Sequence, residues 1–218
     1  MLANRALTMI AATRPAFPTA SVLPVLVAGA LVSAQGIAVD HSLLALAVLN
    51  IALIHGAANV LNDYFDSRSG ADALNEERIY PFSGGSRFIQ NGVLTEREMG
   101  ALGAILISCG AALGLWMALL TGPTLLLMGL AGGALAIFYT APPCLACRGL
   151  GDLAVATCFG VLPLAGTSLI LSGQVSAGSL WLGGSIGCFV AGILWANSIP
   201  DILSDRASGK MTLPVRLG

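Results

Sequence analysis

The chain has 218 residues, of which 56% are hydrophobic and only 10% are charged, and its formal net charge is −1. A soluble domain usually carries about 25% charged residues, so this composition excludes an ordinary water-soluble fold. The near-neutral charge also excludes the basic surface that would hold a nucleic acid. We therefore expect the lipid bilayer to be a partner of this chain.

Apolar runs of the length that crosses a bilayer as a helix, about 20 residues, recur along the chain. The first run follows Arg14 and could be a signal peptide that is cleaved off. We interpret it instead as a transmembrane helix that is retained, because a second apolar run begins soon after it. In chain order, the sequence predicts six spans, at residues 19–39, 42–62, 99–120, 123–140, 151–172 and 180–200. The predicted fold class is all-α, a polytopic transmembrane helical bundle.

The charged residues sort to one side of this predicted bundle. With six alternating spans, all ten basic residues fall on the same face, together with ten of the eleven acidic residues, Asp40 being the exception. The positive-inside rule makes that face cytoplasmic. The sequence thus predicts a multi-pass integral membrane protein, with its polar chemistry facing the cytoplasm.

Two polar segments resemble each other and close the second and the sixth predicted helix. Residues 58–70 and 196–209 both contain Ala-Asn-x-x-x-Asp followed by a second Asp, an Arg and a Ser-Gly pair. Their central residues, Asp63 and Asp201, are 138 positions apart. Internal repeats are common in membrane proteins, and sites lie where the copies meet. We expect the two segments to face each other across one cavity, and chance similarity is the alternative.

Each segment forms a polar stripe, since helical positions three or four apart share a face. The stripes are Asn59, Asn62, Asp63 and Asp66 in the first segment, and Asn197, Asp201 and Asp205 in the second. Oxygen ligands of this kind suit Mg²⁺, which binds through a few carboxylates together with substrate phosphates. The alternative is helix capping and solvated charge, but capping needs one residue and not two stripes. We therefore expect magnesium beside a phosphate-bearing lipid.

Several neighbouring residues are candidates for contact with the phosphates or the lipid. Arg68, Arg87, Arg206 and Lys210 lie near the stripes, where guanidinium and ammonium groups bind phosphate oxygens, although positive-inside topology alone would also place them there. Ser83-Gly84-Gly85-Ser86 is either an anion-binding loop or a plain connection. Tyr139 lines a substrate tunnel or belongs to the aromatic belt. Cys144-x-x-Cys147 lacks the second pair of a zinc site.

These motifs together resemble the UbiA-type intramembrane aromatic prenyltransferases, from about residue 15 to the end of the chain. The matching stretches are Asn62-Asp63-Tyr64-Phe65-Asp66 with Gly70-x-Asp72, residues 81–92, residues 139–143, residues 148–151 and residues 197–218. The sequences of these motifs are most similar to those of the branch that prenylates 1,4-dihydroxy-2-naphthoate in menaquinone biosynthesis.

The resemblance implies a single transmembrane prenyltransferase domain over residues 1–218. It implies Mg²⁺-dependent transfer of a polyprenyl group from polyprenyl diphosphate to an aromatic acceptor. The implied metal ligands are Asn62, Asp63, Asp66, Asp201 and Asp205, and the four aspartates among them are also the implied catalytic residues. The implied substrate-binding residues are Asn59, Asn62, Arg68, Asp72, Arg87, Tyr139, Asn197 and Lys210.

The chain also departs from the family pattern. Gly70 stands where the last aspartate of the first motif is expected, and Asp72 is the nearest carboxylate. The chain holds about six of the nine spans usual for the family, so we expect it to be incomplete at its C-terminus. Another acceptor such as 4-hydroxybenzoate, or an inactive truncated lipid-binding remnant, is the alternative function. A CDP-alcohol phosphotransferase would need its aspartates in one segment, and a transporter would need them at the bilayer midplane.

Overall fold

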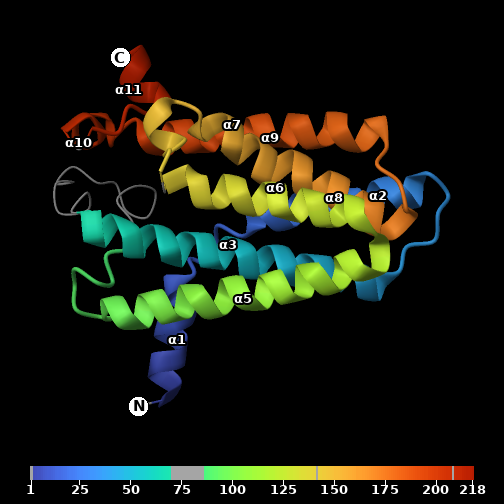
Figure 1. Ribbon diagram of the computed structural model, residues 1–218, viewed down its shortest axis with the longest axis horizontal. Helices are drawn as coiled ribbons and strands as arrows, with labels where there is room; N and C mark the ends of the chain where they lie inside the picture. Colours follow the sequence, from blue (N-terminus) through green and yellow to red (C-terminus); the bar gives the residue numbers. More distant parts are fainter. Residues whose placement is uncertain (1, 70–85, 141, 208) are drawn as a thin grey trace.

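The computed structural model describes residues 2–69, 86–140, 142–207 and 209–218, so Asp72 and residues 83–85 lie outside the described residues. Every regular element in these ranges is a helix (Figure 1), and the predicted all-α class is confirmed. The elements are α1 (Leu2–Ala12), α2 (Thr19–Ala34), α3 (His41–Ser69), α5 (Glu96–Thr121), α6 (Pro123–Thr140), the 3₁₀ turn η1 (Ala146–Arg148), α7 (Gly151–Ala156), the π-helical turn η2 (Thr157–Val161), α8 (Leu162–Ser172), α9 (Ala177–Ser198), α10 (Ile202–Ala207) and α11 (Leu213–Leu217).

All six predicted apolar helices form, with the fifth built from α7, η2 and α8 in succession. Four stretches are long and apolar enough to cross a membrane, namely His41–Arg68, Glu96–Thr121, Gly151–Ser172 and Ala177–Ser198. The apolar helices α2 and α6 are shorter. The largest difference from prediction is at the end of α3, which continues to Ser69 instead of stopping near residue 62. The first polar segment is therefore helical up to that residue.

The long helices run along the long axis of the molecule, and α1 crosses them at one side (Figure 1). The C-terminal ends of α3, α6 and α9 and the N-terminal ends of α5 and α7 gather at the left of this view, where α10 and α11 also lie. The polar segments at these helix ends therefore share one end of the bundle, as the charge pattern predicts. We call this the polar end.

The helix α1 was not predicted from the sequence. Its Arg5 forms an ion pair with Glu98 and donates to the carbonyl oxygen of Val93 at 3.3 Å. Its last residue, Ala12, is completely buried in a small core with three other residues, Val60, Leu94 and Met99. Thus α1 fastens to the beginning of α5 through charge and to the polar half of α3 through packing.

Glycine lets α9 approach the π-helical turn backbone to backbone. A Cβ atom on Gly187 would lie 2.3 Å from the carbonyl oxygen of Ala156, and one on Gly160 would lie 2.3 Å from the carbonyl oxygen of Gly183. Without water in the bilayer to drive helices together, such close packing is a main source of helix association. The contact holds the first half of α9 in a defined position relative to the end of α7 and the π-helical turn.

Replacing Gly187 tests this close approach. We expect Gly187→Ala to destabilise the protein by about 1–3 kcal/mol, because the methyl group would overlap backbone atoms that cannot move aside. Gly184→Ala on the same helix is the matched control, since a Cβ atom there meets nothing within 4 Å. Thermal unfolding of the two variants in detergent measures the difference, and equal midpoints would contradict the packing described.

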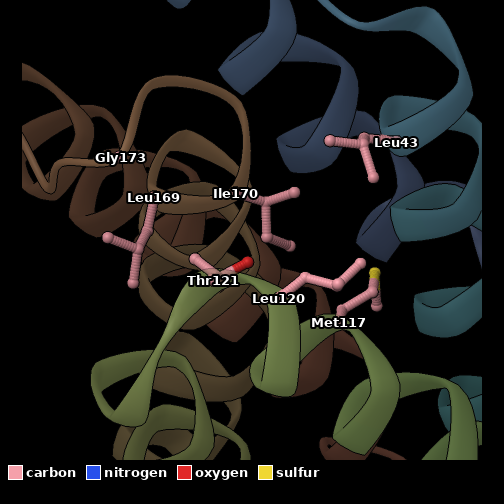
Figure 2. A pocket seen from close by; sticks show the side chains of 7 residues that line it. All are labelled: Leu43, Met117, Leu120, Thr121, Leu169, Ile170 and Gly173. Atoms are coloured by element: carbon pink, nitrogen blue, oxygen red, sulfur yellow. The ribbon is translucent and has the colours of Figure 1, made fainter.

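A small apolar cavity of about 240 Å³ lies at the end of the bundle opposite the polar end, and Figure 2 shows the side chains that line it. Its lining residues come from α3, α5, α8 and the residue after α8: Leu43, Met117, Leu120, Thr121, Leu169, Ile170 and Gly173. Leu43 and Asp66 are 23 residues apart on α3, which at 1.5 Å per residue corresponds to about 35 Å. The cavity is thus far from the Asn and Asp residues of the two polar segments and is not the candidate site.

Candidate functional site

The first polar stripe consists of two adjacent rows on the last turns of α3. Asn59 and Asp63 form one row and Asn62 and Asp66 the other, with four residues between the members of each. Helical rotation of about 100° per residue separates the rows by about 60°, so they face different neighbours. The sequence alone predicts a single stripe, and the structure divides it.

The Asn59–Asp63 row faces the connection between α1 and α2. The Asn59 side-chain amide donates to the carbonyl oxygen of Thr13 at 2.9 Å. Asp63 forms an ion pair with the Arg14 guanidinium through Oδ1, while its Oδ2 accepts from the backbone N–H of Ser86 at 3.1 Å. The Asp63 residue is only 3% exposed. This row therefore ties α3 to two separate connections of the chain.

The Asn62–Asp66 row faces the second polar segment. The Asn62 side-chain amide donates to Asp66 Oδ2 at 3.1 Å, and the Lys210 ammonium forms an ion pair with Asp66 Oδ1 at 3.2 Å. Lys210 is 144 residues further along the chain. Both side chains are partly buried, Lys210 at 24% and Asp66 at 16% exposed. The two polar segments thus come together at the polar end, as their resemblance predicts.

A turn after α10 directs Lys210 back toward α3. Asp205 lies on α10, and its N–H donates to the carbonyl oxygen of Asp201 at 2.8 Å. Gly209 has a φ of +77°, a conformation that favours glycine, and the Lys210 N–H then donates to the carbonyl oxygen of Asp205 at 2.8 Å. The short α10 and its terminal glycine therefore place the two carboxylates and the lysine of the second segment within one compact turn.

The electrostatics of Asp205 reflect this convergence. Burial raises the pKa of Asp205 to about 6, the Lys210 charge opposes the rise, and the carboxylates of Asp201 and Asp66 add to it. Tyr139, at the end of α6, also lies within electrostatic range of Asp66 and Asp205. Side chains from α3, α6 and the second polar segment therefore surround one acidic region.

The remaining predicted residues lie in different places. Arg68 donates to the Tyr64 hydroxyl at 2.9 Å and stacks over that ring, with its central carbon 5.6 Å from the ring centre. Arg206 donates to the Val215 carbonyl oxygen at 3.2 Å and thereby fastens α11. Asn197 lies half-buried on the last turn of α9, and Arg87 follows Ser86 with a φ of +55°. Lys210, another basic residue named from the sequence, forms the ion pair with Asp66.

Arg14 is a site residue that sequence reasoning missed, because its charge was attributed to membrane topology. Its side chain is 20% exposed, and its guanidinium contacts the carboxylate of Asp63, 49 positions later in the chain. The one feature of the sequence that points to a separate contact here is the four-residue spacing of Asn59 and Asp63, which places them in a row of their own on α3. Nothing in that spacing identifies the partner, since the contact depends on how α1 and α2 connect.

The side chains of the acidic region fit magnesium only if the ion binds together with a phosphate group. The available ligands are oxygen atoms, which hard cations prefer. Among the residues that the structure describes, no group of three or more His, Cys, Asp or Glu side chains is arranged to hold a metal ion. Mg²⁺ is commonly held by one or two carboxylates plus the phosphates of a substrate. These residues therefore fit an ion that binds together with a phosphate group, and not a resident ion in a cage of side chains.

Cys144 and Cys147 form a disulfide in the connection between α6 and α7. The sequence motif was considered only as a zinc site, so the disulfide is a feature that the sequence did not predict. The bond closes the turn in which Leu145 N–H donates to the Phe138 carbonyl oxygen at 2.8 Å. The turn also packs near Tyr139, because a Cβ atom on Gly151 would meet both Ala146 and Tyr139 within 3.3 Å.

The raised pKa of Asp205 makes a prediction for the stability of the metal-free protein. An ordinary aspartate titrates near 3.9 in the unfolded chain, so the folded protein holds this proton more tightly than the unfolded chain does. The resulting contribution to stability is present below about pH 4 and is lost as pH rises through 6. We expect the unfolding midpoint of the wild type to fall between pH 5 and pH 7.5 by more than that of Asp205→Asn. Equal pH dependence of the two proteins, measured with a chelator present, would contradict the assignment.

Comparison with known proteins places these features in a family. The family model described as the UbiA prenyltransferase family matches residues 21–218. Similar proteins include a 1,4-dihydroxy-2-naphthoate octaprenyltransferase of Mycobacterium tuberculosis, 34% identical over 81% of this chain and 58% of its own length. Another protein of that name, from Escherichia coli, is 32% identical over 79% of this chain and 56% of its own length.

A third similar protein is the UbiA prenyltransferase domain-containing protein 1 of Danio rerio, 27% identical over 100% of this chain and 63% of its own length. This chain therefore spans about three fifths of the curated relatives that it matches. The resemblance predicted from the motifs is confirmed at the level of the family. The chain belongs to the UbiA prenyltransferase family.

Proposed function

We propose that the protein transfers a polyprenyl group from polyprenyl diphosphate to an aromatic acceptor with the help of Mg²⁺, as one transmembrane prenyltransferase domain over residues 1–218. The observation that carries this proposal is the ion pair of Lys210 with Asp66, at 3.2 Å, which joins the two acidic segments at the polar end. Lipid around the apolar helices would hold the polyprenyl tail, while the polar end would meet the diphosphate.

The proposed roles follow from position. Asp66, Asp201 and Asp205, with Asn62, would hold magnesium on the diphosphate, and bound magnesium would stabilise the negative charge that develops on the leaving group. Lys210 lies at the centre of this region and would contact diphosphate oxygens directly. Arg87 and Asn197 are proposed as further diphosphate contacts, and Tyr139 as a contact for the reacting end of the substrates. Asp72 and Arg68 stay as proposed substrate contacts from the motif alone.

We propose 1,4-dihydroxy-2-naphthoate as the acceptor, since two of the similar proteins named above carry that compound in their names. The role of the protein would then be in menaquinone biosynthesis. The described basic residues cluster on elements of the polar end, and the positive-inside rule then favours a cytoplasmic site in a bacterial inner membrane. An alternative acceptor such as 4-hydroxybenzoate is an outcome that the same assay distinguishes.

A reconstituted assay tests the proposal. Membranes containing the chain are given Mg²⁺, octaprenyl diphosphate and either 1,4-dihydroxy-2-naphthoate or 4-hydroxybenzoate, and the prenylated product is measured. We expect product with the naphthoate, and a loss of about 100-fold or more in Asp66→Asn and Asp201→Asn, because each removes a charge facing the metal and the diphosphate.

Asp40→Asn is the matched control for these substitutions. Asp40 lies at the opposite end of α3, where Oδ1 accepts from the N–H groups of Ser42 and Leu43 at 2.8 and 3.1 Å. Asparagine preserves such a cap, so activity should be unchanged. Product formation that survives both substitutions at the polar end would contradict the proposed site, and absence of product with either acceptor would contradict the proposed function for this chain.

A further inference from the structure

Asp63 is placed differently from the other acidic residues of the motif. Its Oδ1 contacts the Arg14 guanidinium and its Oδ2 accepts from the Ser86 N–H at 3.1 Å. The carboxylate is thus oriented toward two connections of the chain, whereas Asp66, three positions later, is oriented toward Lys210 and the second segment. The two aspartates therefore serve different neighbours despite their closeness in sequence.

Metal binding by Asp63 would conflict with its charge partner. The side chain of Asp63 is 4% exposed and that of Arg14 is 20% exposed. A carboxylate that left this pair to bind an ion would leave a largely buried guanidinium without its counter-charge, which is strongly unfavourable. Asp66, by contrast, forms its ion pair with the Lys210 ammonium.

The connections held by Asp63 have an uncommon backbone. Arg14 has a φ of +53° and Arg87, directly after Ser86, has a φ of +55°. Residues other than glycine rarely adopt this conformation and keep it only where the surroundings hold them. Asp63 binds the side chain of Arg14 and the amide next to Arg87, while Asn59, one turn earlier on α3, holds the Thr13 carbonyl oxygen at 2.9 Å.

We infer that Asp63 is a positioning residue and not a metal ligand: with Asn59 it fixes the Thr13–Arg14 connection and the Ser86–Arg87 turn, so that Arg14 and Arg87 are held beside the diphosphate bound at Asn62, Asp66 and Lys210. This inference rests on the proposed function, because it concerns the same diphosphate. It separates the first motif into a ligand row, Asn62 and Asp66, and a supporting row, Asn59 and Asp63.

Metal stoichiometry separates the two roles without measuring turnover. The purified full chain in detergent is saturated with inorganic pyrophosphate and titrated with Mn²⁺, whose free concentration is followed by electron paramagnetic resonance. We expect Asp63→Asn to bind as many Mn²⁺ ions as the wild type and Asp66→Asn to bind one fewer. Loss of an ion from Asp63→Asn would overturn the inference, and absence of Mn²⁺–pyrophosphate binding by the wild type would overturn the proposed function as well.

A double-mutant cycle tests the action through Arg14. Asp63→Asn and Arg14→Met should each weaken binding of the Mn²⁺–pyrophosphate complex about 10-fold, and the double variant should bind no more weakly than either single variant. Unchanged affinity in Asp63→Asn, or additive losses in the double variant, would overturn the inference. Because the double variant leaves no unpaired charge at this position, it carries the affinity and stoichiometry tests if Asp63→Asn fails to fold.

Discussion

The ion pair between Lys210 and Asp66 is the interaction on which the polar end depends, because it joins segments 144 residues apart in the chain. Around it, Asp205 lies within electrostatic range of Asp66 and Asp201. Several carboxylates confined to a partly buried region repel one another unless cations compensate. Lysine supplies one such charge in the structure. A magnesium ion bound with a diphosphate would supply more, while the diphosphate itself would find the ammonium group already in place.

The apolar part of the molecule keeps this polar end assembled. Gly160, Gly183 and Gly187 let α9 contact the π-helical turn through backbone atoms, and α3 packs along α5. Because α8 contacts both α3 and α9, these two helices are held in one bundle, although neither has a strongly polar face along most of its length. Side chains at the helix ends can then meet across the bundle with little freedom to separate. In this respect the packing of small residues within the membrane is a condition for the chemistry at its surface.

The residues of α3 show how far sequence patterns carry the interpretation. The spacing of Asn59, Asn62, Asp63 and Asp66 predicts that all four share one helical face, and the structure agrees to within about 100° of arc. A helix face of that width contacts more than one neighbour. The pattern therefore predicts a polar face, but the division into a row toward Arg14 and a row toward Lys210 depends on which segments pack there. Arg14 does not belong to any periodic segment of the sequence, and the helix α1 that precedes it was not predicted.

The sequence by itself determined the helical class, the order of the six apolar helices, the gathering of charge at one end and the family, because hydrophobicity, helix length and motif spacing are local properties of the chain. Only the tertiary structure decided that Lys210 reaches Asp66, that Asp63 holds Arg14 and the Ser86 amide, and that Cys144 pairs with Cys147. Those contacts depend on the directions of side chains across packed helices and turns. The identity of a polar residue shows that it needs a hydrogen-bond or ion-pair partner when buried, but not which residue that partner will be.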